Sequence, residues 1–387
     1  NSIRRLEPLN PKFVSVTYGA NSGVRDRTHS VIERIQNETN LLAAPHLTLV
    51  DASDEELQAH FKDLKEKGVD GLMYNGGHDP ATYARAGKIA KAEGLEFNTW
   101  VPTMVQGKNK NLKPEWYAVN RNGESAYDKP AYVSHYTFLC PSKEGTYNFL
   151  SELYGSIADV PEVDGIHLDY IRYPDVILAR GLWDKYGLTM NVEHPQFDYC
   201  YCDDCTSGFH AKTGIDIKRV DDAPSVEEWK QYRYDLITSI VNRLADVVHA
   251  KGKKINAAVF PGPHSVAKKL VRQEWDKWNL DAIHPMNYND FYLEDTKWIG
   301  EVTKEAVTSV DNKKPIFSGL FICPNPEKKA SQADPENHGL VPEELEDAVR
   351  ESMVNGAAGI CLFTPGRMTD KDWEILAEII HNDYTKN

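Results

Sequence analysis

No stretch of this sequence approaches the roughly 18 uninterrupted apolar residues that a membrane-spanning helix needs. Basic residues are also scarce: 44 lysines and arginines stand against 58 acidic residues, which gives a net charge of -14. No run of basic residues is present that could bind along the phosphate backbone of a nucleic acid. The chain begins Asn1-Ser2, without a methionine or a signal-like apolar segment. We therefore expect a soluble chain with a cut or replaced natural start, no membrane span and no nucleic-acid partner.

Apolar, β-rich runs alternate with amphipathic helical stretches along nearly all of the 387 residues, which is typical of parallel strands joined by helical crossovers. The expected strands are Phe13–Tyr18, His46–Val50, Gly71–Asn75, Glu96–Val101, Asp164–Tyr170, Ile255–Phe260, Ala282–Asn287, Ile316–Phe321 and Gly359–Phe363. The pattern predicts an α/β fold, a (β/α)8 TIM-type barrel, with one N-terminal strand in excess. Because a barrel fixes strand number and shear together, Phe13–Tyr18 must either widen the ring as an added strand or lie outside it. Of these two alternatives we favour a closed ring of eight with Phe13–Tyr18 displaced from it.

Between the strands, the clearest helix is expected over Ser225–Ala250, where Ser225 and Glu228 have the spacing of a capping box. The long irregular segments, 106–142, 175–224 and 323–342, all follow strands. Loops at that end of a barrel build the active-site face, so these segments predict a substrate cleft. They are rich in aromatic residues of the kind that stack on sugars, although most such residues serve to pack the loops.

The strand expected at 164–170 ends in charge. Alternate residues of a barrel strand point inward, so His167 and Asp169 share a face and Asp169 stands at the C-terminal rim, where catalytic groups gather. Arg172 and Tyr173 lie just beyond and could hold a carboxylate or a substrate hydroxyl. The competing interpretation makes Asp169 and Arg172 a structural ion pair.

A glycosidase needs two carboxylates, roughly 5 Å apart for retention or 6.5–9.5 Å for inversion, one of them kept protonated. With Asp169 as the first, the best-placed second carboxylate is Asp290, which has an equally plausible role as a turn or cap residue. Weaker candidates are Asp79, Asp175 and Glu274. Further rim residues expected to bind sugar hydroxyls are Asn75, Trp100, Asn256, His264, His284, Asn287 and Tyr288.

Several motifs in order carry a resemblance to a known family: DGIHLDYIRYP at 164–174, YCYCDDC at 199–205, WKQYRYD at 229–235, INAAVF at 255–260, LDAIHPMNYNDF at 280–291 and KPIFSGLF at 314–321. Over about residues 60–387 the chain resembles glycoside hydrolases of the Bacteroidetes glycosyl-hydrolase-like family 10 type. The resemblance implies a barrel, a carbohydrate substrate and a secreted or periplasmic location.

The cysteines cluster as Cys200-x-Cys202-x-x-Cys205, with His194 before and His210 after. A C-x-x-C pair supplies half of a tetrahedral zinc site, which Cys200 and either histidine could complete, but the usual second distant pair is missing. A structural zinc, a local disulfide and free thiols all remain open. Cys140, Cys323 and Cys361 stand alone in the sequence.

The N-terminal residues indicate a second, different family. PKFVSVTYGANSGVRDRTH at 11–29 and AAPHLT at 43–48 closely resemble methylenetetrahydrofolate reductase, a flavin-dependent barrel, up to about Leu57. In that family Thr17 and His46 would contact flavin, but other family motifs are absent. We therefore expect a natural or engineered chimera, with residues 1–57 as a reductase-like β-α-β segment and 58–387 as the hydrolase-like barrel, together forming one structural domain.

Three functions follow from these resemblances: a glycoside hydrolase, a carbohydrate-binding barrel without catalysis and, with less support, a flavin oxidoreductase. We expect no bound cofactor and a colourless protein.

Overall fold

The computed structural model describes residues 14–17, 43–47, 52–66, 71–334, 336–363, 367–369, 371–372, 374–375 and 378–379. The strands are β1 (Val14–Thr17), β2 (Ala43–Leu47), β3 (Gly71–Tyr74), β4 (Glu96–Pro102), β5 (Gly165–Asp169), β6 (Lys254–Val259), β7 (Ala282–Pro285), β8 (Phe317–Phe321) and β9 (Gly359–Phe363). All nine predicted strands are thus confirmed; β2 lies three residues earlier than expected.

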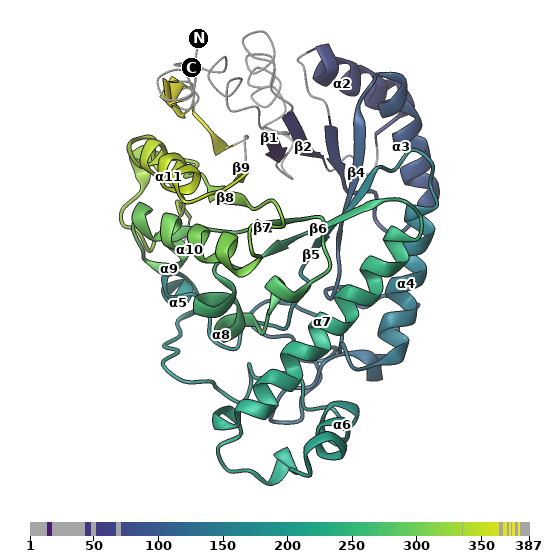
Figure 1. The fold of residues 1–387 in the computed structure, drawn as a ribbon, viewed down its shortest axis with the longest axis vertical. Helices are drawn as coiled ribbons and strands as arrows, with labels where there is room; N and C mark the ends of the chain where they lie inside the picture. The colour runs from purple at the N-terminus through teal and green to yellow at the C-terminus, as the bar shows by residue number, and fades with distance from the viewer. Residues whose placement is uncertain are drawn as a thin grey trace.

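The helices are α2 (Asp54–Glu66), α3 (Pro80–Ala92), α4 (Glu144–Ala158), α5 (Trp183–Tyr186), α6 (Asp203–Thr213), α7 (Glu227–His249), α8 (Lys268–Val271), α9 (Asn289–Tyr292), α10 (Thr296–Ser309) and α11 (Pro342–Val354). In Figure 1, α3, α4 and α7 flank the strands on one side, and α10 and α11 flank them on the other. This is the layering expected when amphipathic crossover helices bury one face against a parallel sheet.

The nine strands form a single parallel sheet in the order β7-β6-β5-β4-β3-β2-β1-β9-β8. β1 pairs with β2 over Val14–Thr17 and with β9 through Ser15 and Val16, so it lies inside the sheet. The favoured alternative, a displaced strand, was therefore wrong, and β1 is the added strand of the other alternative. Both of its edges find ladder partners, which satisfies backbone groups that a displaced strand would leave open.

The two strands at the ends of that order, β7 and β8, also contact each other. Isolated parallel bridges join Ile283 of β7 to Ile316 and Met286 to Gly319 of β8, and the Ile283 amide donates to the Pro315 carbonyl at 3.1 Å. These bridges bring β7 beside β8. A complete barrel of defined strand number and shear stays a prediction.

Helix α7 shows how the core is built. Trp229, Ile240 and Leu244 of this helix are buried, and the helix packs on α4 and β6. The predicted capping box was wrong: Val226 precedes the helix without a side-chain cap, and the Ser225 hydroxyl donates to the Asp222 carbonyl at 2.8 Å in a preceding 3₁₀ turn.

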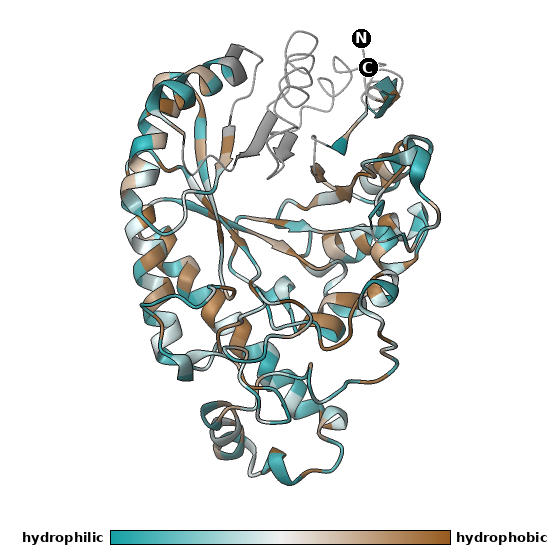
Figure 2. Ribbon diagram, turned by 180° about the vertical axis from the view of Figure 1, so that it is seen from behind, coloured by the Kyte–Doolittle hydropathy of each residue, from teal (hydrophilic) through white to brown (hydrophobic). Residues whose placement is uncertain are grey.

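Hydrophobic residues follow this layering. Figure 2 shows hydrophobic colouring along the central strands and parts of the long helices, with hydrophilic stretches on the helices and around α6. Among the described helices, none combines the length and apolarity needed to cross a bilayer.

Candidate functional site

One face of the central strands carries a row of polar side chains. Trp100 of β4, His167 of β5 and Asn256 of β6 are direct partners in the parallel register. Directly opposed residues point to the same side of a sheet, so these three share a face. His284 of β7 extends the row: its ring lies 5.4 Å from that of His167, edge to face.

His167 is held within this row. It is 4 % exposed, and its Nδ1 hydrogen-bonds the side-chain oxygen of Asn256. Burial lowers the pKa of His167, while the bond to Asn256 and the charge of Asp169 act to raise it. The imidazole is therefore favoured in its neutral form beneath Asp169.

Asp169 stands at the last position of β5, opposite Pro102, and is partly exposed. Burial raises the pKa of its carboxyl, against the opposing effects of His167, the Tyr170 amide, Arg172 and a hydrogen bond from Trp100. The Tyr170 amide donates to Oδ1 at 2.7 Å. A carboxyl with a raised pKa can stay protonated nearer to neutral pH than an ordinary aspartate.

The backbone turns sharply at this point. Tyr170 has φ of 50°, a left-handed conformation that a bulky residue rarely adopts. Such strain is typical of functional sites, where it aims a side chain at the cost of local stability. Here the turn directs the Tyr170 amide at the Asp169 carboxylate.

Arg172 binds a different acid from the one considered in the sequence. Its guanidinium donates to Asp175 Oδ2 at 2.8 Å and to the Tyr173 carbonyl at 3.0 Å, and it lies 4.9 Å from the centre of the Phe260 ring. Within the part of the chain that the structure describes, Asp169 forms no ion pair. The ion-pair alternative for Asp169 and Arg172 is therefore not what the geometry shows.

The aromatic residues of the long loops mainly pack on one another. Tyr132 stacks on Phe197 at 4.2 Å and meets Tyr136 and Tyr186 edge to face. Tyr136 continues the contact to Tyr170, beside Asp169. These rings form a wall next to the rim, as expected of loop aromatics with a packing role.

Asp290, the predicted second carboxylate, lies in α9 and is 1 % exposed. Its Oδ2 binds the Lys329 ammonium at 2.6 Å and accepts from the Gly339 amide at 2.8 Å. These contacts tie α9 to the loop that follows β8.

The weaker carboxylate candidates are also engaged. Asp79 caps α3, accepting from the Ala81 amide at 3.0 Å, and Asp175 pairs with Arg172. Glu274 binds Lys268 at 2.5 Å and Lys277 at 2.9 Å. Each has a structural contact that explains its position.

Other predicted binding residues divide between the rim and elsewhere. Burial raises the pKa of Tyr288 well above its usual range, and the nearby groups Cys361 and then Asp169 add to the rise, so Tyr288 lies near Asp169. Asn75 turns its side chain back to accept from the Gly77 amide at 3.1 Å. His264, which donates its backbone amide to Glu305, is exposed after β6.

Asn287 and Tyr173 belong to the predicted binding set, and the structure places both in buried surroundings. Asn287 is fully buried and donates to Thr303 of α10 at 3.1 Å and to Ser318 of β8 at 2.9 Å, on the helix side of the sheet. Tyr173 is 1 % exposed and lies near the cysteine cluster, whose charge adds to burial in raising its pKa. Alternation along a strand stops at its end, so neither placement could be read from the sequence.

The cysteine cluster gains a member. Cys200, Cys202 and Cys205 are joined by Cys140, all four are buried, and their sulfur atoms lie within 4.8 Å of one another. Neither predicted histidine takes part: His194 hydrogen-bonds the Thr189 carbonyl, and His210 is exposed on α6. The fourth residue was missed because nothing in its local sequence marks it.

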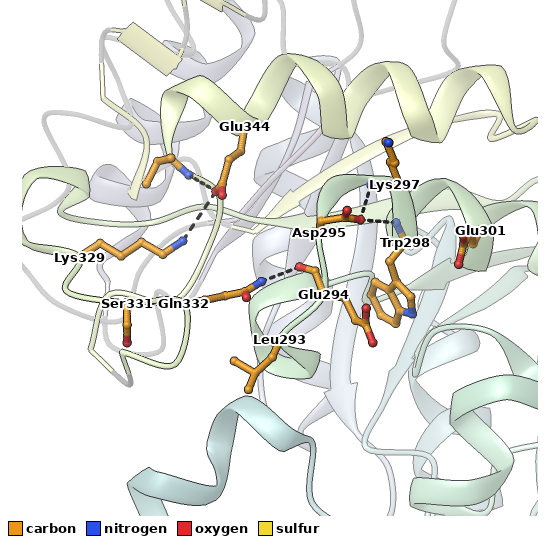
Figure 3. A pocket seen from close by; sticks show the side chains of 11 residues that line it. Leu293, Glu294, Asp295, Lys297, Trp298, Glu301, Lys329, Ser331, Gln332 and Glu344 are labelled. Carbon is orange, nitrogen blue, oxygen red and sulfur yellow. Dashed lines mark hydrogen bonds and ion pairs between the residues drawn. The ribbon is translucent and has the colours of Figure 1, made fainter.

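A pocket of about 800 Å³ lies apart from the polar row, between the start of α10 and the loop after β8 (Figure 3). Trp298, Glu294 and Glu344 line it, and Lys329 reaches across from Glu344 to Asp290. None of the residues around Asp169 contributes to its lining. The pocket therefore adjoins Asp290 rather than Asp169.

Comparison with known proteins gives two separate similarities. The family model of methylenetetrahydrofolate reductase matches residues 1–93. The 5,10-methylenetetrahydrofolate reductase of Escherichia coli (strain K12) is 59 % identical over 69 residues, which is 18 % of this chain and 23 % of that enzyme. The chain thus spans about a quarter of the curated relatives that it matches. The N-terminal resemblance is confirmed, and the family match extends past Leu57.

By structure, the chain is similar to the glycoside hydrolase domain of PgaB (BpsB) from Bordetella bronchiseptica, with a TM-score of 0.60 at 12 % identity over 95 % of this chain and 98 % of that one. It is also similar to the β-galactosidase of the psychrophilic Marinomonas ef1, with a TM-score of 0.54 at 11 % identity over 95 % of this chain and 59 % of that one. At such identities the likeness concerns the fold, which is an α/β fold shared with glycoside hydrolases.

Proposed function

We propose that this protein is a glycoside hydrolase in which Asp169 acts as the general acid. The observation that carries the proposal is the state of this one carboxyl: it ends a central strand, has a raised pKa and stands outside any described ion pair. A general acid must hold its proton near the working pH and deliver it to the glycosidic oxygen. The shared fold with two carbohydrate-cleaving enzymes supports this choice.

The surrounding residues fit roles in positioning a sugar. Trp100 hydrogen-bonds Asp169 and offers an aromatic surface beside it, and Tyr288 lies near enough for the charge of Asp169 to raise its pKa. Neutral His167 adds no positive charge that would force Asp169 to ionise. A sugar ring stacked on these aromatic groups would bring its glycosidic oxygen to the carboxyl.

Asp290 remains our candidate for the second carboxylate. The Lys329 ammonium lies 2.6 Å from its Oδ2 and the Gly339 amide donates to the same oxygen at 2.8 Å, so the carboxylate is held in one position. Since Asp290 is 1 % exposed, its use in catalysis requires the loop that carries Lys329 to move away. Asp290→Asn should then abolish turnover as completely as a change at Asp169.

The test is to measure turnover of a panel of aryl glycosides and polysaccharides, and the melting temperature, for the parent and Asp169→Asn. We expect turnover to fall at least about 100-fold, the usual contribution of general acid catalysis, with folding intact. Asp164→Asn is a matched control, because Asp164 precedes the same strand at its opposite end and caps the Phe97 amide at 2.7 Å. Unchanged turnover in Asp169→Asn on a verified substrate would end the proposal.

The raised pKa also fixes the sign of the pH dependence. The unfolded chain releases the Asp169 proton near the ordinary value of about 4, below the pH at which the folded protein does. Stability is therefore lost as the pH rises from that value to the folded pKa, and Asp169→Asn should not show this loss. If catalysis needs protonated Asp169, activity should fall as the pH rises through the pKa of Asp169 in the folded protein. This fall should occur at a higher pH than it would for an aspartate with an ordinary pKa.

A second candidate is a carbohydrate-binding barrel without catalysis. The four other candidate carboxylates are each engaged in an ion pair or a helix cap, namely Asp290, Asp175, Glu274 and Asp79. Asp169 therefore has no evident partner carboxylate, which favours binding without catalysis. Titration calorimetry with the same glycans separates the candidates: binding without any turnover would support the binding barrel. The flavin oxidoreductase is supported only by the N-terminal match, and a visible spectrum without a flavin band would set it aside.

A further inference from the structure

We propose that Cys140, Cys200, Cys202 and Cys205 bind one zinc ion as a tetrahedral, four-thiolate structural site. The Cys140 sulfur lies 3.6 Å from that of Cys202 and 3.5 Å from that of Cys205. A disulfide would need about 2.05 Å. Zinc–sulfur bonds of about 2.3 Å in a tetrahedron place the sulfurs about 3.8 Å apart, close to the observed spacing.

The backbone brings the four cysteines together from two long loops. Residues 117–120 form the shared segment: Tyr117 bridges to Leu139 on one side, and Asn120 bridges to Tyr199 on the other. The Tyr201 amide donates to the Val119 carbonyl at 2.7 Å, which fixes the chain between Cys200 and Cys202. Helix α6 begins directly after Cys202 and carries the fourth sulfur, that of Cys205, in its first turn. The cluster is therefore fixed by main-chain pairing rather than by chance contact of side chains.

Hydrogen-bond donors surround the sulfur atoms. The Val119 amide donates to the Cys200 sulfur at 3.3 Å, and the Ser142 hydroxyl lies 3.1 Å from the Cys205 sulfur and 3.0 Å from that of Cys140. Four thiolates and one zinc ion carry a net charge of -2, which such donors and the positive end of α6 offset. Four apolar cysteines packed in a core would need no donors.

The chemistry of the donor set assigns the metal and its role. Four sulfur ligands select zinc among common divalent ions and leave no open position for substrate, so the site is structural. It would fasten the loop after β4, which holds Cys140, to the loop after β5, which holds the other three. Those loops carry Tyr132, Tyr136 and Phe197, whose rings form the wall beside Asp169. The site thus stabilises the rim without taking part in the reaction, and its test does not depend on any activity.

The experiment is elemental analysis of the full chain, produced in zinc-supplemented medium, kept reduced and purified without a metal-affinity tag. We expect about one zinc per chain in the parent and in Cys323→Ser, and a loss of at least about tenfold in Cys140→Ser. Cys323 is a matched control because it is equally buried but lies outside the cluster.

Because Cys140→Ser also removes buried packing, two measurements on the parent accompany this variant. A mercurial that caps thiols should release the zinc stoichiometrically into a colorimetric chelator, and refolding with Co²⁺ should give the intense visible absorption of tetrahedral cobalt thiolate. Thiol counting after denaturation should give all six cysteines as free thiols once metal is removed. A count of two free thiols would indicate two disulfides and would overturn the zinc site. Iron in place of zinc would overturn the metal assignment. Six free thiols in a protein without metal would also overturn the site.

Discussion

Asp198 is the most heavily paired acid among the described residues. It is fully buried, forms an ion pair with Arg233, and lies 3.6 Å from Arg272. The Tyr201 hydroxyl donates to its Oδ2 at 2.6 Å. Burial acts to raise the pKa of Asp198, but the two arginines outweigh it and hold the pKa below its usual value. This network joins the loop that holds the cysteines to α7.

We predict that Asp198→Asn lowers the free energy of unfolding by on the order of 3–5 kcal/mol, because the buried Arg233 would lose its counter-charge. Thermal and denaturant unfolding measure the loss. Glu346→Gln is the comparison, since Glu346 pairs with Arg350 on the surface of α11 and should cost at most about 0.5 kcal/mol. A similar small loss in both variants would contradict the assigned role.

The pH dependence of this network has the opposite sign to that of Asp169. The folded pKa of Asp198 is lowered, so its contribution to stability is present above the unfolded value and is lost as the pH falls through the folded one. Asp198→Asn should therefore flatten the acid limb of the stability profile.

At the residue scale, strand alternation predicted correctly that His167 and Asp169 share a face, since period two survives in the folded strand. It could not predict partners far along the chain: Lys329 for Asp290, Asp198 for Arg233, or Cys140 for the other three cysteines. These contacts depend on how long loops fold over the rim, and spacing in the sequence carries no record of that.

At the scale of elements, the junction of β7 and β8 is unusually close. A side-chain carbon added to Gly319 would lie 2.6 Å from the Pro285 carbonyl oxygen and 3.3 Å from the Met286 α-carbon. Met286 and Gly319 form one of the two bridges between these strands. The glycine thus permits the backbone approach that brings the sheet ends together.

We predict that Gly319→Ala destabilises the protein by about 1–3 kcal/mol, since the backbone atoms it meets cannot rotate away. Gly155→Ala is the control: it lies within α4, its added carbon would meet only Val247 at 3.4 Å, and alanine favours a helix by about 0.5–1 kcal/mol. The melting temperature should fall for the first variant and hold or rise for the second. Equal behaviour would argue that the junction of β7 and β8 is loose.

The elements themselves were largely predictable. Every expected strand exists because buried parallel strands read as short β-rich apolar runs bounded by helical stretches. Ends were less predictable: α7 begins without the expected Ser225 cap, because that hydroxyl turns to a nearer carbonyl in the preceding 3₁₀ turn. Local competition of this kind is decided by backbone geometry that the sequence does not display.

At the scale of the whole molecule, two separate similarities meet in one sheet. β1 and β2 fall within residues 1–93, which match the family model of the reductase, whereas the chain as a whole is similar in fold to glycoside hydrolases. The register pairs Thr17 of β1 with His46 of β2, so the two positions that the reductase resemblance marks lie opposite each other. The sheet accepts the reductase-like strands by inserting β1 between β2 and β9.

The position of β1 between β2 and β9 leads to a prediction about a shortened chain. Removing residues 1–42 deletes β1 and leaves one edge of β2 and one edge of β9 without a partner. Open parallel edges expose backbone donors and acceptors and promote association, so the shortened chain should melt earlier and elute as larger species in size-exclusion chromatography. Val16→Pro tests the same strand at full length, since proline removes a ladder donor between two neighbours, and Val16→Ile is its control. If the shortened chain instead melts at the parent's temperature as a single species, β2 must pair directly with β9. The eight-stranded ring expected from the sequence would then be the stable sheet, and β1 would be surplus to it.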